Sequence, residues 1–172
     1  LAYTEFLFPT FDLMYSRWQL ATRYLKYYFK AASGKGHGIH SPFVFSFITR
    51  VLNDHTHFPE YDQAEQLRRR LKRDHTIITV EDFGAGSSLN KSNQRSVASI
   101  AAHAAKPKKF GQLLFRMARY YQPSAILELG TSLGITTSYL SLAHPAAQLQ
   151  TLEGASSVAA VARNNFEQLQ LA

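Results

Sequence analysis

The stretch that decides the fold is 125-AILELGTSLGITTSYLSLAHPAAQLQTLEG-154. It opens with a short apolar run, 125–129, which is typical of a strand buried in a parallel sheet. A glycine-containing turn, 130–134, leads into an apolar segment with helical spacing, 135–142, and a second strand pattern, 148–152, ends at Glu153. A further amphipathic helix is expected over 155–169. Alternating strands and helices predict an α/β fold with a parallel sheet.

The residues at the strand ends favour a nucleoside-containing ligand. Glycine at Gly130 and Gly134 lets the turn adopt left-handed dihedral angles and lets a ligand approach the backbone. The helix that begins near Gly134 offers unpaired N–H groups, which favour an anionic group such as a carboxylate. Glu153 follows Gly130 at about the 20-residue spacing of an acid that accepts hydrogen bonds from ribose hydroxyls.

The spacing of the glycines distinguishes between the known types of cofactor-binding turn. The turn reads Glu-x-Gly-x-x-x-Gly over 128–134, which matches neither the dinucleotide fingerprint nor a phosphate-binding loop. The segments 128-ELGTSLGIT-136 and 151-TLEG-154 resemble motif I and the following acid of class I methyltransferases, most closely the catechol and caffeoyl-CoA type O-methyltransferases. The segment 111-GQLL-114 resembles the helix before that motif. Residues 24–87 resemble a bacterial subset of methyltransferases.

The resemblance implies a class I, Rossmann-like methyltransferase fold that binds S-adenosyl-L-methionine and methylates a small molecule. The basic clusters at 68–73 and 106–109 add RNA or protein as alternative acceptors. The resemblance identifies no catalytic residue. In catechol-type relatives the metal-binding acids follow the second strand–helix unit, so a divalent metal would belong beyond residue 172. The resemblance implies that the following residues bind the cofactor: Glu128, Gly130, Thr131, Ser132, Gly134, Thr136, Glu153 and Gly154.

The sequence suggests three regions. Residues 1–14 are expected to be extraneous or disordered, 15–109 a mainly helical cap, and 110–172 the first half of the cofactor-binding domain. Only the first two strand–helix units are expected, so the chain is interpreted as a fragment truncated at its C-terminus, inactive alone. Within the cap, helices are expected over 15–32, 43–52, 61–73, 92–105 and, at its border, 110–121, with a short strand over 76–80.

Composition limits the protein class. An apolar content of 45% fits a globular chain, and no apolar run approaches the roughly 18 residues of a membrane span. The chain has no cysteine, which excludes disulfides and thiolate metal sites. We therefore expect a cytoplasmic protein without a membrane partner.

The charge leaves one alternative open. The formal net charge is +7, with basic clusters at 68–73 and 106–109. A solvated helix face is the simpler interpretation of the first cluster. The alternative function is a non-catalytic module that binds nucleic acid through this helix, with a degenerate Rossmann-like half.

Three further motifs contain residues that are common in functional sites. The segment 82-DFGAG-86 is also a form of the cofactor turn, but no second strand or acid follows it, so it is interpreted as a loop. His37 and His40 lie in a glycine-rich loop, 33–42, and either could serve as a base. His55 and His57 lack the neighbouring ligands of a metal site, so no metal is predicted.

Overall fold

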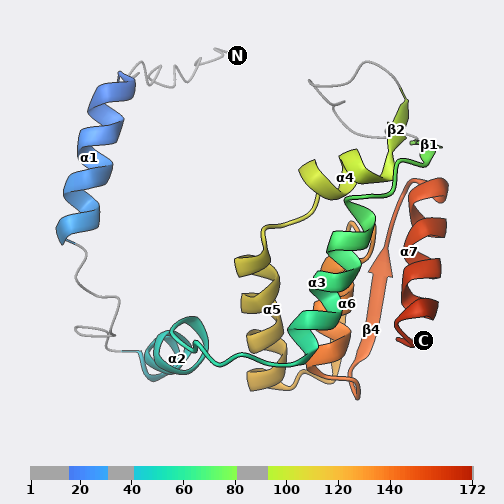
Figure 1. Ribbon diagram of the computed structural model, residues 1–172. Coiled ribbons are helices and arrows are strands. Elements are labelled where there is room, and N and C mark those ends of the chain that lie inside the picture. The colour runs from blue at the N-terminus through green and yellow to red at the C-terminus, as the bar shows by residue number, and fades with distance from the viewer. Residues whose placement is uncertain (1–15, 31–40, 81–92, 172) are drawn as a thin grey trace, which may run out of the picture. The chain divides into compact units, whose positions relative to one another are not determined.

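The protein is a mixed α/β chain, shown in Figure 1 as a computed structural model that describes residues 16–30, 41–80 and 93–171. It divides into two compact units, 1–48 and 49–172. In chain order the described elements are α1 (Arg17–Lys30), α2 (Pro42–Phe47), the π-helical turn η2 (Ile48–Leu52), α3 (Glu60–Leu71), β1 (Ile77–Thr79), β2 (Gln94–Ser96), α4 (Val97–His103), α5 (Lys108–Tyr121), β3 (Ala125–Leu129), α6 (Ile135–Ala143), β4 (Gln148–Leu152) and α7 (Ser156–Gln168).

The first unit holds α1 and α2. The Ser41 hydroxyl accepts a hydrogen bond from the Val44 N–H and so caps α2, and Pro42 occupies the first turn, where its missing N–H costs nothing. The helix predicted over 43–52 is therefore present, but it changes from α to π geometry at Ile48. The segment 1–14 and the loop histidines His37 and His40 lie outside the described residues.

The core of the second unit is aromatic. Helix α6 packs against both α5 and α3, and each helix contributes a ring: Tyr139 and Phe115 are fully buried, and Tyr61 is 2% exposed. The Tyr61 and Phe115 rings meet edge to face with centroids 4.9 Å apart, a geometry that adds about 0.5–1.5 kcal/mol to the area they bury. The boundary predicted near residue 110 thus falls inside this unit.

An antiparallel pair of strands replaces part of a predicted helix. The helix expected over 92–105 is α4, which begins only at Val97, because Gln94 to Ser96 pair with β1. The Ser96 side chain accepts a hydrogen bond from the Ser99 N–H and caps α4. The prediction was wrong because the polar run before Val97 gives no strand signal of its own; pairing with the β-branched run 77–79 decides it. The segment 82-DFGAG-86 lies outside the described residues.

The parallel pair follows the prediction closely. Strands β3 and β4 have the predicted bounds and pair in parallel, with Ala125 opposite Gln148 and Leu129 opposite Leu152. Each is followed by its helix, α6 and α7, so the α/β class is confirmed and both strand–helix units are present.

Among residues 16–30, 41–80 and 93–171, none of the helices combines the length and the hydropathy that a membrane span requires.

Candidate functional site

The turn between β3 and α6 has the predicted backbone. Gly130 has φ +91° and Gly134 has φ +81°, and Gly134 is the N-cap of α6. The N–H groups of Gly130 and Thr131 both donate to the Leu152 carbonyl, at 2.8 and 3.1 Å, which attaches the turn to the end of β4. The carboxyl ends of the two strands therefore meet here, where ligands bind in open α/β sheets.

A pocket of about 190 Å³ opens over this turn. Five of the predicted cofactor residues line it, together with the first residues of α6 and the loop between α4 and α5: the lining is Ala104, Ala105, Lys106, Leu114, Glu128, Leu129, Gly130, Thr131, Ser132, Leu133, Ile135 and Thr136. Three predicted residues, Gly134, Glu153 and Gly154, are not part of the lining. The pocket is smaller than the roughly 300 Å³ or more of a typical small-molecule site.

The two glycines have different roles. Gly130 lines the pocket, and a Cβ at this position would meet nothing within 4 Å, so the space beside it is open. A Cβ at Gly134 would lie 2.5 Å from the Phe166 ring of α7. The prediction that Gly134 admits a ligand needs correcting, because this glycine allows close contact between the turn and α7 instead.

Glu153 stabilises the turn through hydrogen bonds from two backbone N–H groups. Its Oε2 accepts a 2.8 Å hydrogen bond from the Ser132 N–H, and its Oε1 accepts a 3.0 Å bond from the Ala155 N–H at the start of α7. Ser132 has φ +50°, an unusual value for a residue with a side chain, and the carboxylate stabilises it there. Each oxygen keeps one further lone pair, so the half-exposed carboxylate can still accept bonds from a ligand.

Glu128 is held by threonines at the end of β3. Its Oε2 accepts hydrogen bonds from the hydroxyls of Thr137 and Thr151, and Thr131 and Thr151 are 2.6 Å apart at their hydroxyls. Among the described residues only Oε2 of this carboxylate has protein partners. The sequence did not predict the threonine contacts, because they join three elements.

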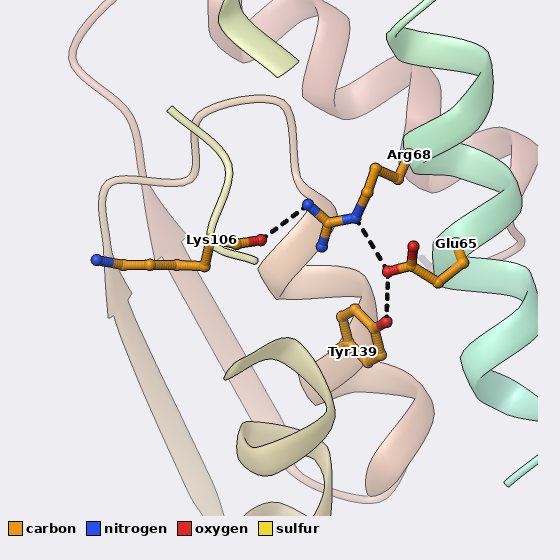
Figure 2. Close-up of polar contacts among 4 residues, drawn as sticks. All are labelled: Glu65, Arg68, Lys106 and Tyr139. Carbon is orange, nitrogen blue, oxygen red and sulfur yellow. Dashed lines mark hydrogen bonds and ion pairs between the residues drawn. The ribbon is translucent and has the colours of Figure 1, made fainter. Parts of the chain in front are cut away.

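The first basic cluster is only partly a solvated face. Arg68 is 7% exposed, its Nε donates to Glu65 Oε1 at 2.9 Å, and its Nη1 donates to the Lys106 carbonyl at 2.8 Å (Figure 2). Tyr139 donates to the same Glu65 oxygen at 2.6 Å. Burial, reinforced by this bond, raises the pKa of Tyr139 well above its usual value, so the hydroxyl remains a donor at neutral pH. The prediction of a solvated cluster was therefore wrong at Arg68.

A second arginine on α3 supports the turn from the other side. Arg70 Nη2 donates to Asn165 Oδ1 at 3.1 Å, and the buried Asn165 amide donates to the Leu133 carbonyl at 2.9 Å. Helix α3 thus contacts two segments that line the pocket. Arg68 bonds directly to the loop at Lys106, and Arg70 is linked to the glycine turn through Asn165. The charge pattern gave no sign of either contact.

The remaining histidines do not assemble a metal site among the described residues. His57 Nε2 lies 3.6 Å from Asp62 Oδ1, and both side chains are more than half exposed. No group of three or more potential ligands is found in the described ranges 16–30, 41–80 and 93–171.

Comparisons with protein-family models, curated protein sequences and solved structures give no match to this chain. The functional argument therefore rests on the geometry of the pocket.

Proposed function

We propose that the second unit carries the cofactor-binding part of an S-adenosyl-L-methionine-dependent methyltransferase of Rossmann-like fold, acting on a small-molecule acceptor. The observation that carries the proposal is the meeting of Glu128, the left-handed Gly130 turn and Glu153 at the carboxyl ends of two parallel strands. This is the position at which α/β folds bind nucleoside cofactors. The proposal is supported by the open space beside Gly130, a residue that lines the pocket.

The site residues would bind two different parts of the cofactor. Glu128 and the pocket residues of the turn would line the methionine end of the cofactor, and Glu153 would accept hydrogen bonds from the ribose at the tip of β4. The turn is already attached to β4 by backbone bonds to Leu152, so little ordering is needed when the ligand binds. The cofactor supplies an activated methyl group on a sulfonium, and the protein aligns it and excludes water.

The nucleic-acid alternative has less support than the composition suggested. Arg68 and Arg70 make protein contacts, so the stretch 68–73 does not present a continuous row of cations for phosphates. Salt-dependent RNA binding without affinity for S-adenosylhomocysteine would favour it.

Calorimetric titration of S-adenosylhomocysteine into the chain tests the proposal. Glu153→Gln replaces one acceptor oxygen by an amide, and we expect binding to weaken by about 1 to 3 kcal/mol, as for a lost charged hydrogen bond. The matched control is Glu167→Gln, an exposed acid on α7, which should change binding by less than about 0.5 kcal/mol.

The melting temperature of each variant completes the test, because Glu153 also holds the Ser132 and Ala155 amides. Weaker binding at an unchanged melting temperature supports a ligand contact. A folded wild-type chain that does not bind S-adenosylhomocysteine would disprove the proposed function.

A further inference from the structure

A lysine from outside the strand–turn–helix motif contributes to the pocket. Lys106 lies in the short loop between α4 and α5 and lines the pocket together with residues of the glycine turn. Figure 2 shows its carbonyl pointing toward Arg68 and its side chain extending in the opposite direction. The loop thus brings Lys106 to the pocket lining, and Arg68 holds its backbone carbonyl.

The backbone of Lys106 is held by a buried charged network. Arg68 and Glu65 are 7% and 8% exposed, and the guanidinium spans from Glu65 to the Lys106 carbonyl. Glu65 in turn accepts the Tyr139 hydroxyl from α6, the helix that starts at the pocket. A forked guanidinium can make both bonds at once in a fixed geometry, which a lysine could not reproduce.

The pocket lining includes both a negatively charged residue and a positively charged one. Glu128 supplies a carboxylate at the end of β3. The lining also includes Lys106 and the first residues of α6, Ile135 and Thr136, whose N–H groups begin the helix. The first turn of α6 contains no acidic residue, so the positive end of its dipole is not offset locally. Such a pocket suits a zwitterionic amino-acid group, which carries both an ammonium and a carboxylate, better than an uncharged group.

We propose that Lys106 binds the α-carboxylate of the ligand's amino-acid portion, with Arg68 as the residue that positions Lys106. This inference rests on the proposed function and adds to it a carboxylate-binding residue that the resemblance does not include. The ligand is then recognised as an amino acid at one end and as a nucleoside at the other.

Two ligands separate this contact from the rest of the site. S-adenosylhomocysteine carries the carboxylate, whereas 5′-methylthioadenosine has the same nucleoside thioether without the amino-acid group. We expect Lys106→Ala to raise the Kd of S-adenosylhomocysteine about 5- to 10-fold, between an exposed ion pair and a charged hydrogen bond, and to leave 5′-methylthioadenosine unchanged. Lys108→Ala, which removes an exposed lysine outside the pocket lining, is the control and should alter neither Kd.

The positioning role of Arg68 has its own test. Arg68→Lys keeps a positive charge beside Glu65 but loses the fork, and we expect the Kd of S-adenosylhomocysteine to rise several-fold while that of 5′-methylthioadenosine stays the same. Arg69→Lys is the control on the exposed side of α3. A merely structural role would weaken both ligands equally, and that result would overturn the positioning role.

The outcomes distinguish this inference from the function on which it rests. If the wild type binds S-adenosylhomocysteine and Lys106→Ala behaves like Lys108→Ala, the inference is wrong and the proposed function stands. If the folded wild type binds neither ligand, both are wrong. Weaker binding of S-adenosylhomocysteine, but not of 5′-methylthioadenosine, in Lys106→Ala supports the inference if Lys108→Ala binds both ligands like the wild type.

Discussion

Two glycines four residues apart share a left-handed backbone, yet they meet different surroundings. Gly130 lies beside open space in the pocket lining, whereas the position of a Cβ at Gly134 is already occupied by Phe166. The strain of a left-handed alanine is common to both positions, roughly 1–2 kcal/mol. A steric cost arises only at Gly134, so the same substitution separates the two roles.

We predict that Gly134→Ala lowers the free energy of unfolding by about 2–5 kcal/mol, the sum of backbone strain and overpacking. Gly130→Ala should cost only about 1–2 kcal/mol and should weaken S-adenosylhomocysteine binding, since it adds a methyl group to a residue that lines the pocket. Urea denaturation of both variants measures the difference. In a Phe166→Ala background the cost of Gly134→Ala should fall to that of Gly130→Ala; an undiminished cost would exclude the steric explanation.

At the scale of elements, the sequence predicted those strands and helices that have a recognisable local pattern of residues. The apolar run 125–129, the glycine turn and the alternation toward Glu153 each carry their own signal, and the elements appear at those residues. Strand β2 carries none, because Gln94, Arg95 and Ser96 become a strand only through pairing with β1.

The candidate site could be predicted only in part, for the same reason. Five of its eight predicted residues line the pocket, because motif spacing is local. The burial of Arg68 depends on Glu65, Tyr139 and a carbonyl 38 residues away, and the charge run around it resembles any solvated helix. The spacing of Glu153 predicts a ligand contact, whereas its hydrogen bonds from the Ser132 and Ala155 N–H groups depend on the shape of the turn.

The network around Arg68 makes α3 sensitive to one substitution. Arg68→Met would leave the Glu65 carboxylate buried without its cation, and we expect the free energy of unfolding to fall by about 3–5 kcal/mol. Arg69→Met, one residue along on the exposed side, should change it by less than about 0.5 kcal/mol. Urea denaturation gives both values.

A second substitution checks the cause. Glu65→Gln removes the charge but keeps an oxygen that can accept the Tyr139 hydroxyl, so adding it to Arg68→Met should recover part of the lost stability. If the double variant is less stable than Arg68→Met, the buried charge is not the origin of the effect.

At the scale of the second unit, one face of the parallel sheet exposes an apolar patch of leucines beside Gln148 and Gln150. Strand residues alternate between the two faces, and the outward positions include Leu127, Leu129 and Leu152, which are 63%, 75% and 59% exposed. Leu129 and Leu152 lie side by side in the register. Among the described strands, β3 and β4 pair only with each other, so both outer edges of the sheet also carry unpaired backbone groups.

We predict that this face drives self-association of the chain. The net charge of +7 opposes contact between copies, so association should strengthen with salt, which shortens the Debye length to about 3 Å at 1 M. Leu129→Lys places a charge within the apolar patch and should reduce association, whereas Ala160→Lys adds the same charge on the exposed side of α7 and should reduce it much less. Sedimentation velocity at two salt concentrations measures this. A wild type that stays monomeric at both salt concentrations would contradict the prediction.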